Sequence, residues 1–200
     1  MLKNGRDFPV IRVSLLLLFT YFGMAKATWA ENLDDLNTYK SCGKSENSRA
    51  LAKQIIEDDN QQRSTLTCNS LLSEIAQKKA EEMAMEGVVS HHGPGGTPDQ
   101  RLIDAGYQLK IPKDTMNFNH VEAVIGGFSS SEEVLDNFKN SFHHRVHLFA
   151  EHEFFLQQDE IGVGYAYNWD SPHVDYWVVY IASEKPFYAE ESSNITEQAQ

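Results

Sequence analysis

The stretch His120-Val-Glu122-Ala-Val-Ile-Gly126-Gly127 and the stretch Asn140-Ser-Phe-His143-His144-Arg145-Val-His147 decide the fold of this chain. The first is a short apolar segment that carries one acidic residue and ends in glycines. The second places a histidine beside an arginine, one predicted helix later. Upstream, Ser90-His91-His92-Gly93 opens a loop rich in glycine and proline, which Asp99-Gln-Arg101 follows. Together the three segments contain histidines, an acidic residue and an arginine in a fixed order.

Hydrophobic periodicity predicts the helices and strands around these stretches. Apolar residues recur with helical spacing between a cap at Asn69 or Ser70 and Glu86, so a helix is expected there. A capping box at 130–133 begins another helix, whose buried stripe is expected to reach Phe142. Further helices are expected over 48–58 and 99–105, and the two strands of an antiparallel hairpin over 161–167 and 174–181. Helices followed by late strands indicate an α+β protein.

In this order the motifs resemble the signature of the CAP superfamily (cysteine-rich secretory proteins, antigen 5 and pathogenesis-related proteins), also called the SCP domain. Val89-Ser-His91 resembles the family's aromatic-Ser-His step, and Glu122-Ala-Val-Ile-Gly-Gly127 resembles its Glu-Asn-Ile-Ala-x-Gly. Phe138-x-x-Ser141-x-x-His144-Arg145 is similar to Trp-x-x-Ser-x-Gly-His-Arg. The pattern is closest to the bacterial secreted branch. The resemblance covers residues 46–183 and implies a three-layer α-β-α sandwich with a central antiparallel sheet.

The resemblance also implies a central cleft, lined by His91, Glu122, Ser141, His144 and Arg145. In family members two histidines and one or two glutamates at such positions can hold a divalent cation, here His91, Glu122 and His144. Two neutral imidazoles and a carboxylate suit Zn²⁺ and leave a fourth position open for water, the minimum for a zinc-activated hydrolytic water. His120 is an additional candidate ligand if its segment is a strand, because it then shares a face with Glu122; otherwise it is a loop histidine.

Several positions in and around this cleft depart from the family pattern or stay open. The second acidic position of the eukaryotic branch is Ser141 here, as in bacterial relatives, and about five extra residues lie between 148 and 161. His143 and His147 stand at i and i+4, which suits either an extra metal clamp or two exposed or helix-capping histidines. Arg145 is expected to pair with an acid such as Glu122 or Asp99 and so to fix the cleft wall.

The ends of the chain predict export. A basic leader, an apolar run from Val13 to Met24 and small residues up to Ala30 are typical of a signal peptide over 1–30, and the apolar run is too short to span a bilayer. Residues 31–45 form a polar segment, and 184–200 an acidic tail. Loss of the leader removes four basic residues and one acidic residue, so the net charge changes from −12 to −15. Such an acidic protein is a poor partner for nucleic acid.

Cys42 and Cys68 are the two cysteines of the chain. In the oxidising compartment that export implies, extracellular or periplasmic, they are expected to form a structural disulfide; two unpaired, buried thiols are the alternative.

Three functions fit these features. The leading one is a secreted, non-enzymatic CAP-type protein whose cleft binds a small ligand, lipid or peptide, with or without a divalent metal. A metal-dependent hydrolase that uses His91, Glu122 and His144 is the second. A structural or interaction domain with a vestigial cleft is the third.

Overall fold

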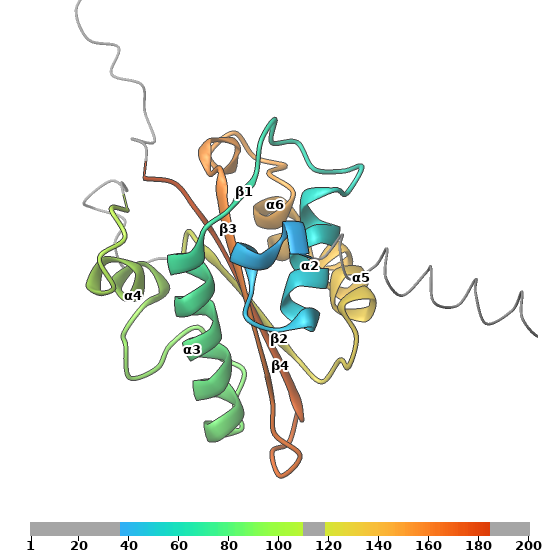
Figure 1. Cartoon of the computed structure of the whole chain (residues 1–200), viewed down its shortest axis with the longest axis vertical. Coiled ribbons are helices and arrows are strands. Elements are labelled where there is room, and N and C mark those ends of the chain that lie inside the picture. The colour runs from blue at the N-terminus through green and yellow to red at the C-terminus, as the bar shows by residue number, and fades with distance from the viewer. Residues whose placement is uncertain (1–36, 110–118, 185–200) are drawn as a thin grey trace, which may run out of the picture. The chain divides into compact units, whose positions relative to one another are not determined.

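Residues 37–109 and 119–184 are described by the computed structural model, and they alternate helices with strands (Figure 1). The predicted leader lies outside the described residues, as does all of the predicted tail beyond Glu184. The elements in chain order are η1 (Lys40–Cys42), α2 (Glu46–Ile56), β1 (Thr67–Cys68), α3 (Ser70–Glu86), α4 (Pro98–Asp104), β2 (Glu122–Gly126), α5 (Ser131–Asn140), α6 (Phe142–Leu148), η3 (Phe155–Gln157), β3 (Glu160–Tyr167) and β4 (Asp175–Ala182).

The strands of the described residues form one sheet in the order β1-β3-β4-β2. Strands β3 and β4 are the predicted hairpin, and β2 pairs antiparallel with β4, Glu122 opposite Tyr180. The expected antiparallel pairing holds for β2, β3 and β4, and the two-residue strand β1 at the edge pairs parallel with β3. A parallel neighbour requires a crossover, and here the chain between β1 and β3 contains α3 to α6.

Helices cover both faces of this sheet, which gives the expected α-β-α sandwich. Successive residues of β4 point to opposite faces. Trp177, Val179 and Ile181 lie in one buried cluster with apolar residues of α2, α5 and α6. Tyr176, Val178 and Tyr180 lie in a second buried cluster with residues of α3 and α4. Figure 1 shows the same separation, with α3 and α4 on one side of the strands and α2 and α5 on the other.

Helix α3 packs directly on the backbone of β3. Asn69 caps the helix by accepting hydrogen bonds from the backbone N–H groups of Leu71 and Leu72, and Gly87 ends it in the left-handed conformation at φ 70°. Strand β3 presents Gly162 and Gly164 to the helix. A Cβ on Gly164 would lie 2.2 Å from backbone atoms of Ala76, so the glycines allow the close approach.

A break between α5 and α6 corrects one expectation. Helix α5 ends at Asn140, and Ser141 is extended (φ −93°, ψ 118°) before α6 begins. Phe142 therefore does not continue the buried stripe of α5, in which Val134 and Phe138 are fully buried, and its side chain is 63% exposed. The reason is local: helical spacing carries a residue to the same face only while the helix continues.

The segment before α2 is joined to the sheet. Cys42 is fully buried and forms a disulfide with Cys68 of β1. Because Cys42 belongs to the cluster that α2 and α5 form, part of the predicted polar segment contributes to the core. In the ranges 37–109 and 119–184, no helix is both long and apolar enough to cross a membrane.

Candidate functional site

Glu122 is the buried centre of the site. It is the first residue of β2, and its side chain is fully buried. One carboxylate oxygen lies 2.9 Å from Nδ1 of His91, and the other accepts a hydrogen bond of 2.7 Å from Arg101. Since an ionised carboxylate only accepts, Nδ1 of His91 carries the proton in this pair. The imidazole of His91 is thereby oriented, with Nε2 left for another partner.

Arg101 holds Glu122 and the surrounding loop in place. Its guanidinium also donates to the carbonyl oxygens of His91 (2.9 Å) and Gly96 (2.8 Å) and to the hydroxyl of Tyr180 (3.0 Å). Burial alone would lower the pKa of Arg101, but the charge of Glu122 and the contact with Tyr180 raise it above its ordinary value. Arg101 was expected as a motif residue, in Thr97-Pro-Asp-Gln-Arg101, but not as the partner of Glu122. The sequence signal for this role was the position of Arg101, two residues after Asp99 and shortly after the glycines of the loop.

His91, Glu122 and His144 meet at one cavity of about 220 Å³. Helix α6 brings His144 to it, the loop after α3 brings His91, and β2 brings Glu122. The complete lining is His91, Asn119, Glu122, Phe142, His143, His144, Val146, His147 and Phe155. We call this cavity the cleft. The three residues that the sequence suggested as a ligand set thus line one space.

Two histidines of α6, His144 and His147, have lowered pKa values and are uncharged at neutral pH. Burial, followed by the nearby imidazoles of His91 and His143, lowers the pKa of His144 below its ordinary value. Burial, with the neighbouring Arg63 guanidinium, lowers the pKa of His147 to about 3. Nδ1 of His144 and Nε2 of His147 are buried and have no hydrogen-bond partner among the described residues. His147 is only 7% exposed, so it is neither an exposed nor a helix-capping histidine.

Three expected cleft residues lie elsewhere. Arg145 pairs with Glu151 at 2.7 Å on the surface, so its expected pair with Glu122 or Asp99 is not formed. His120 precedes β2 instead of lying in it, and its Nδ1 lies 2.8 Å from a carboxylate oxygen of Asp99. The alternation that would have placed His120 beside Glu122 therefore does not apply. Ser141 connects α5 to α6 and is not part of the cleft lining.

Several lining residues were not expected from the sequence. Asn119 closes the cleft beside Glu122: its side-chain oxygen accepts from the backbone N–H of Glu122 (2.9 Å), and its nitrogen donates to the Glu122 carbonyl (2.7 Å). Phe142, Val146 and Phe155 supply an apolar wall. Phe155 comes from the extra residues before β3. The apolar run Phe154-Phe155-Leu156 in this segment was the sequence signal for an apolar surface.

A zinc site with three protein ligands does not fit this arrangement. Within the described ranges, no group of three or more His, Cys, Asp or Glu side chains is placed to hold a metal ion. Both oxygens of Glu122 are engaged, one with His91 and one with Arg101. Glu122 thus acts as the carboxylate that orients an imidazole, a role usually found outside the ligand shell of a metal.

Comparisons with known proteins support the fold. No family model matches the chain, and no curated protein matches it. The chain is similar to an outer surface protein from Borrelia burgdorferi, with a TM-score of 0.57 and 20% identity over 70% of this chain and 95% of that one. It also matches the venom allergen-like protein 4 of Schistosoma mansoni, with a TM-score of 0.34 and 14% identity over 70% of this chain and 88% of that one.

These findings define the class of the fold and nothing finer. The TM-score of 0.57 shows a shared architecture, whereas 20% identity does not show a shared activity, and the second match is too distant to carry an argument. The three layers, the hairpin at the end of the domain and the motif residues at the cleft make the fold CAP-like.

Proposed function

We propose that this is a secreted binding protein of the CAP superfamily, related to its bacterial branch, which holds a small neutral amphipathic molecule in the cleft. The observation that carries the proposal is the pair of buried imidazole nitrogens, on His144 and His147, that have no partner in the described residues. Buried polar atoms are nearly always hydrogen-bonded, so each calls for a partner from outside. Both residues line the cleft, although these two nitrogens are themselves buried, so a ligand in the cleft would reach them once the rings turn.

The lining suggests the chemistry of the ligand. A neutral imidazole nitrogen either donates or accepts a hydrogen bond, depending on the tautomer. A hydroxyl group on the ligand can pair with it in either case, because a hydroxyl both donates and accepts. The charge of Glu122 is already matched by Arg101, so the cleft offers no unmatched charge to an ionic ligand. Phe142, Val146 and Phe155 would contact an apolar body. A cavity of about 220 Å³ is smaller than the ~300 Å³ at which drug-sized sites begin, so the ligand is small.

Export rests on separate observations. The predicted leader over 1–30 and the disulfide between Cys42 and Cys68 both suit an oxidising compartment outside the cytoplasm. The outer surface protein from Borrelia burgdorferi has a similar architecture, which agrees with this location. The net charge of −12 does not favour nucleic acid or an anionic membrane as a partner.

Calorimetric titration with three probes of similar size tests the ligand class: benzyl alcohol, benzoate and benzylammonium. We expect benzyl alcohol to bind most tightly. His91→Ala should weaken its binding about tenfold, because an oriented hydrogen-bonding group is lost, whereas His92→Ala, at the adjacent exposed position, should not. Tighter binding of either ion, or equal effects of the two substitutions, would contradict the proposal.

Zn²⁺ content and probe binding, measured on the same protein, distinguish the two alternative functions from the proposed one. A metal-dependent hydrolase needs stoichiometric Zn²⁺ that is lost in a His91→Ala/His144→Ala double variant, and it would require Glu122 to leave Arg101 or His91. A structural or interaction domain with a vestigial cleft would bind neither the probes nor Zn²⁺. Each outcome therefore selects one function.

A further inference from the structure

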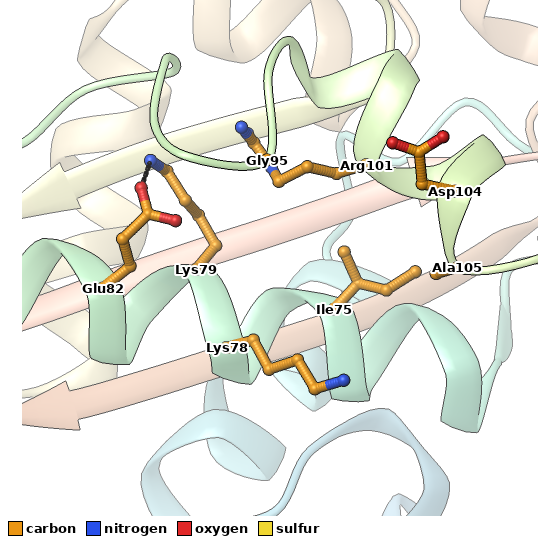
Figure 2. A pocket seen from close by; sticks show the side chains of 8 residues that line it. All are labelled: Ile75, Lys78, Lys79, Glu82, Gly95, Arg101, Asp104 and Ala105. Carbon is orange, nitrogen blue, oxygen red and sulfur yellow. Dashed lines mark hydrogen bonds and ion pairs between the residues drawn. The ribbon is translucent and has the colours of Figure 1, made fainter.

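Arg63 is a buried cation that is held by neutral groups. The residue is only 6% exposed, and in the described part of the chain no carboxylate lies within ion-pair distance of its guanidinium. Other buried cations are paired. Arg101 contacts Glu122, and in a second cavity, between α3 and α4, Lys79 lies 2.6 Å from Glu82 (Figure 2). Burial lowers the pKa of Arg63 to about 9, so its guanidinium is still charged at neutral pH. Because an unpaired buried charge is costly, neighbouring polar groups must stabilise it.

The guanidinium of Arg63 binds the C-terminal end of α6. Nη1 donates to the carbonyl oxygen of Leu148 at 2.8 Å, and Nη2 donates to that of His147 at 2.9 Å. The side chain of Gln61 supports this contact, because it accepts from Nη1 at 3.1 Å and donates to the Leu148 carbonyl at 3.1 Å. Carbonyl groups in the last turn of a helix lack N–H partners within it, and positive charge is favourable there. Arg63 therefore fixes the helix that carries His144 and His147 into the cleft.

The same guanidinium reaches the other side of the cleft through Gln158. Nη2 of Arg63 donates to the side-chain oxygen of Gln158 at 3.4 Å, and Gln158 is fully buried. The side-chain nitrogen of Gln158 donates to the carbonyl oxygen of His120 at 2.7 Å. His120 stands two residues before Glu122, the first residue of β2. A continuous series of hydrogen bonds thus runs from the backbone of His147 in α6 to the backbone that leads into β2.

We propose that Arg63, acting together with Gln158, is a positioning residue for ligand binding, which sets the distance between α6 and the start of β2 and hence the width of the cleft. This inference rests on the proposed function, because it concerns the same cleft. Neither residue lines the cleft, so neither contacts the ligand itself. A residue that only capped α6 would need the carbonyls of His147 and Leu148, whereas the link through Gln158 to His120 joins the two sides of the cleft.

The charge of Arg63 and its hydrogen-bonding geometry can be separated by one substitution. After burial, the charge of Arg63 is the next cause that lowers the pKa of His147, ahead of the imidazoles of His144 and His91. Glu122, on the opposite wall, is already paired with a cation. A lysine at position 63 keeps the positive charge but has one nitrogen in place of the planar fork. Arg63→Lys should therefore leave His147 uncharged at neutral pH while it loosens the link between the two walls.

Calorimetric titration with benzyl alcohol tests the proposal, at a temperature where circular dichroism shows each variant to be folded. Arg63→Lys and Gln158→Met should each weaken binding at least about tenfold, because the cleft walls lose a connecting hydrogen bond. Arg49→Lys is the matched control, at an arginine of α2 that donates to the carbonyl of Lys44. Gly106→Ala is the control for lost stability, at a position outside the cleft lining. Both controls should bind benzyl alcohol as the original protein does.

Nitrogen NMR of the histidine side chains without ligand gives a second readout. The resonances of His144 and His147 should move in Arg63→Lys and stay in place in Arg49→Lys. Unchanged binding in either Arg63→Lys or Gln158→Met, or an equal loss in Gly106→Ala, would overturn the proposal. If Arg63→Lys does not fold, Gln158→Met decides, since it leaves the bonds of Arg63 to α6 in place. If the original protein does not bind benzyl alcohol, the proposed function fails, and unmoved resonances in Arg63→Lys would then overturn this inference separately.

Discussion

The buried carboxylate of Glu122 is stabilised chiefly by its ion pair with Arg101. It is fully buried, and Arg101 supplies its only cationic partner in the described residues that is charged at every accessible pH. Arg101→Ala should therefore destabilise the protein by about 3–5 kcal/mol, the usual cost of leaving one member of a buried pair without the other. Urea unfolding at pH 7 measures the change in the free energy of unfolding.

Arg145→Ala is the matched control. Its pair with Glu151 is 38% and 28% exposed, and exposed pairs contribute about 0–1 kcal/mol. Equal losses for the two arginine variants would mean that Arg101 does not hold the cleft.

His147 makes stability depend on pH. Burial holds the pKa of His147 at about 3, while an unfolded chain has an ordinary value near 6.5. The unfolded state therefore binds a proton first as the pH falls, so stability is complete above about pH 6.5 and is lost towards pH 3. The slope from this one group approaches about 1.4 kcal/mol per pH unit between those values.

His147→Phe should make the stability profile flatter between pH 6 and 4. Melting temperatures recorded across that window measure it, and His92→Phe, at an exposed position, serves as the comparison. An unchanged slope in His147→Phe would show that His147 is already protonated in the folded protein.

At the residue scale, the sequence could indicate His91, Glu122 and His144 because their motifs stand in a characteristic order. The sequence could not show which arginine pairs with Glu122. Arg145 stands next to His144, but adjacent residues of a helix point about 100° apart, so a neighbour of a cleft residue faces elsewhere. Arg101 reaches the cleft from a separate helix, a contact that depends on how α4 packs against the sheet.

At the scale of elements, the approach of α3 to β3 depends on two glycines. Gly164→Ala would place a Cβ at 2.2 Å from the Ala76 backbone, and backbone atoms cannot move aside as a flexible side chain can. We expect a loss of roughly 1–3 kcal/mol or more, typical of overpacking in a core. Chemical denaturation measures the loss.

Gly106→Ala provides a contrast at a glycine where a Cβ would meet nothing within 4 Å. It should cost only about 1–2 kcal/mol, from the positive φ of 91°. A Gly164→Ala variant as stable as the original protein would show that α3 does not pack on β3 as closely as described.

The elements themselves were largely predictable. Caps at Asn69 and Gly87 placed α3 within a residue or two, and the two apolar segments joined by a turn placed the hairpin of β3 and β4 equally well. The break at Ser141 was not predictable, because the apolar spacing through Phe142 fits a continuous helix. That break has a functional consequence, since it leaves Phe142 on the wall of the cleft and not in the core.

At the scale of the whole molecule, the disulfide ties the N-terminal part of the domain to the sheet. It joins residues 26 positions apart and encloses α2. A Cys42→Ala/Cys68→Ala variant should lose about 3.5 kcal/mol, the loop-closure entropy of a loop of this length. Thermal unfolding of the variant and of the reduced protein should give similar shifts, and no shift in either would contradict a stabilising role.

The layered architecture followed from the order of elements together with the resemblance, whereas the parallel pairing of β1 did not. A two-residue strand carries no periodicity, so nothing in Thr67-Cys68 distinguishes a strand from a loop. Its pairing depends on the tertiary position of β3.

The central claim is that His91, Glu122 and His144 form one cleft that binds a small neutral ligand. Nitrogen NMR of the histidine side chains during titration with benzyl alcohol tests it most directly. The resonances of His91, His144 and His147 should shift together with one binding curve, and those of His92 should stay constant. Shifts at His92 alone, or no shift at His91 and His144 once the probe has bound, would contradict the claim.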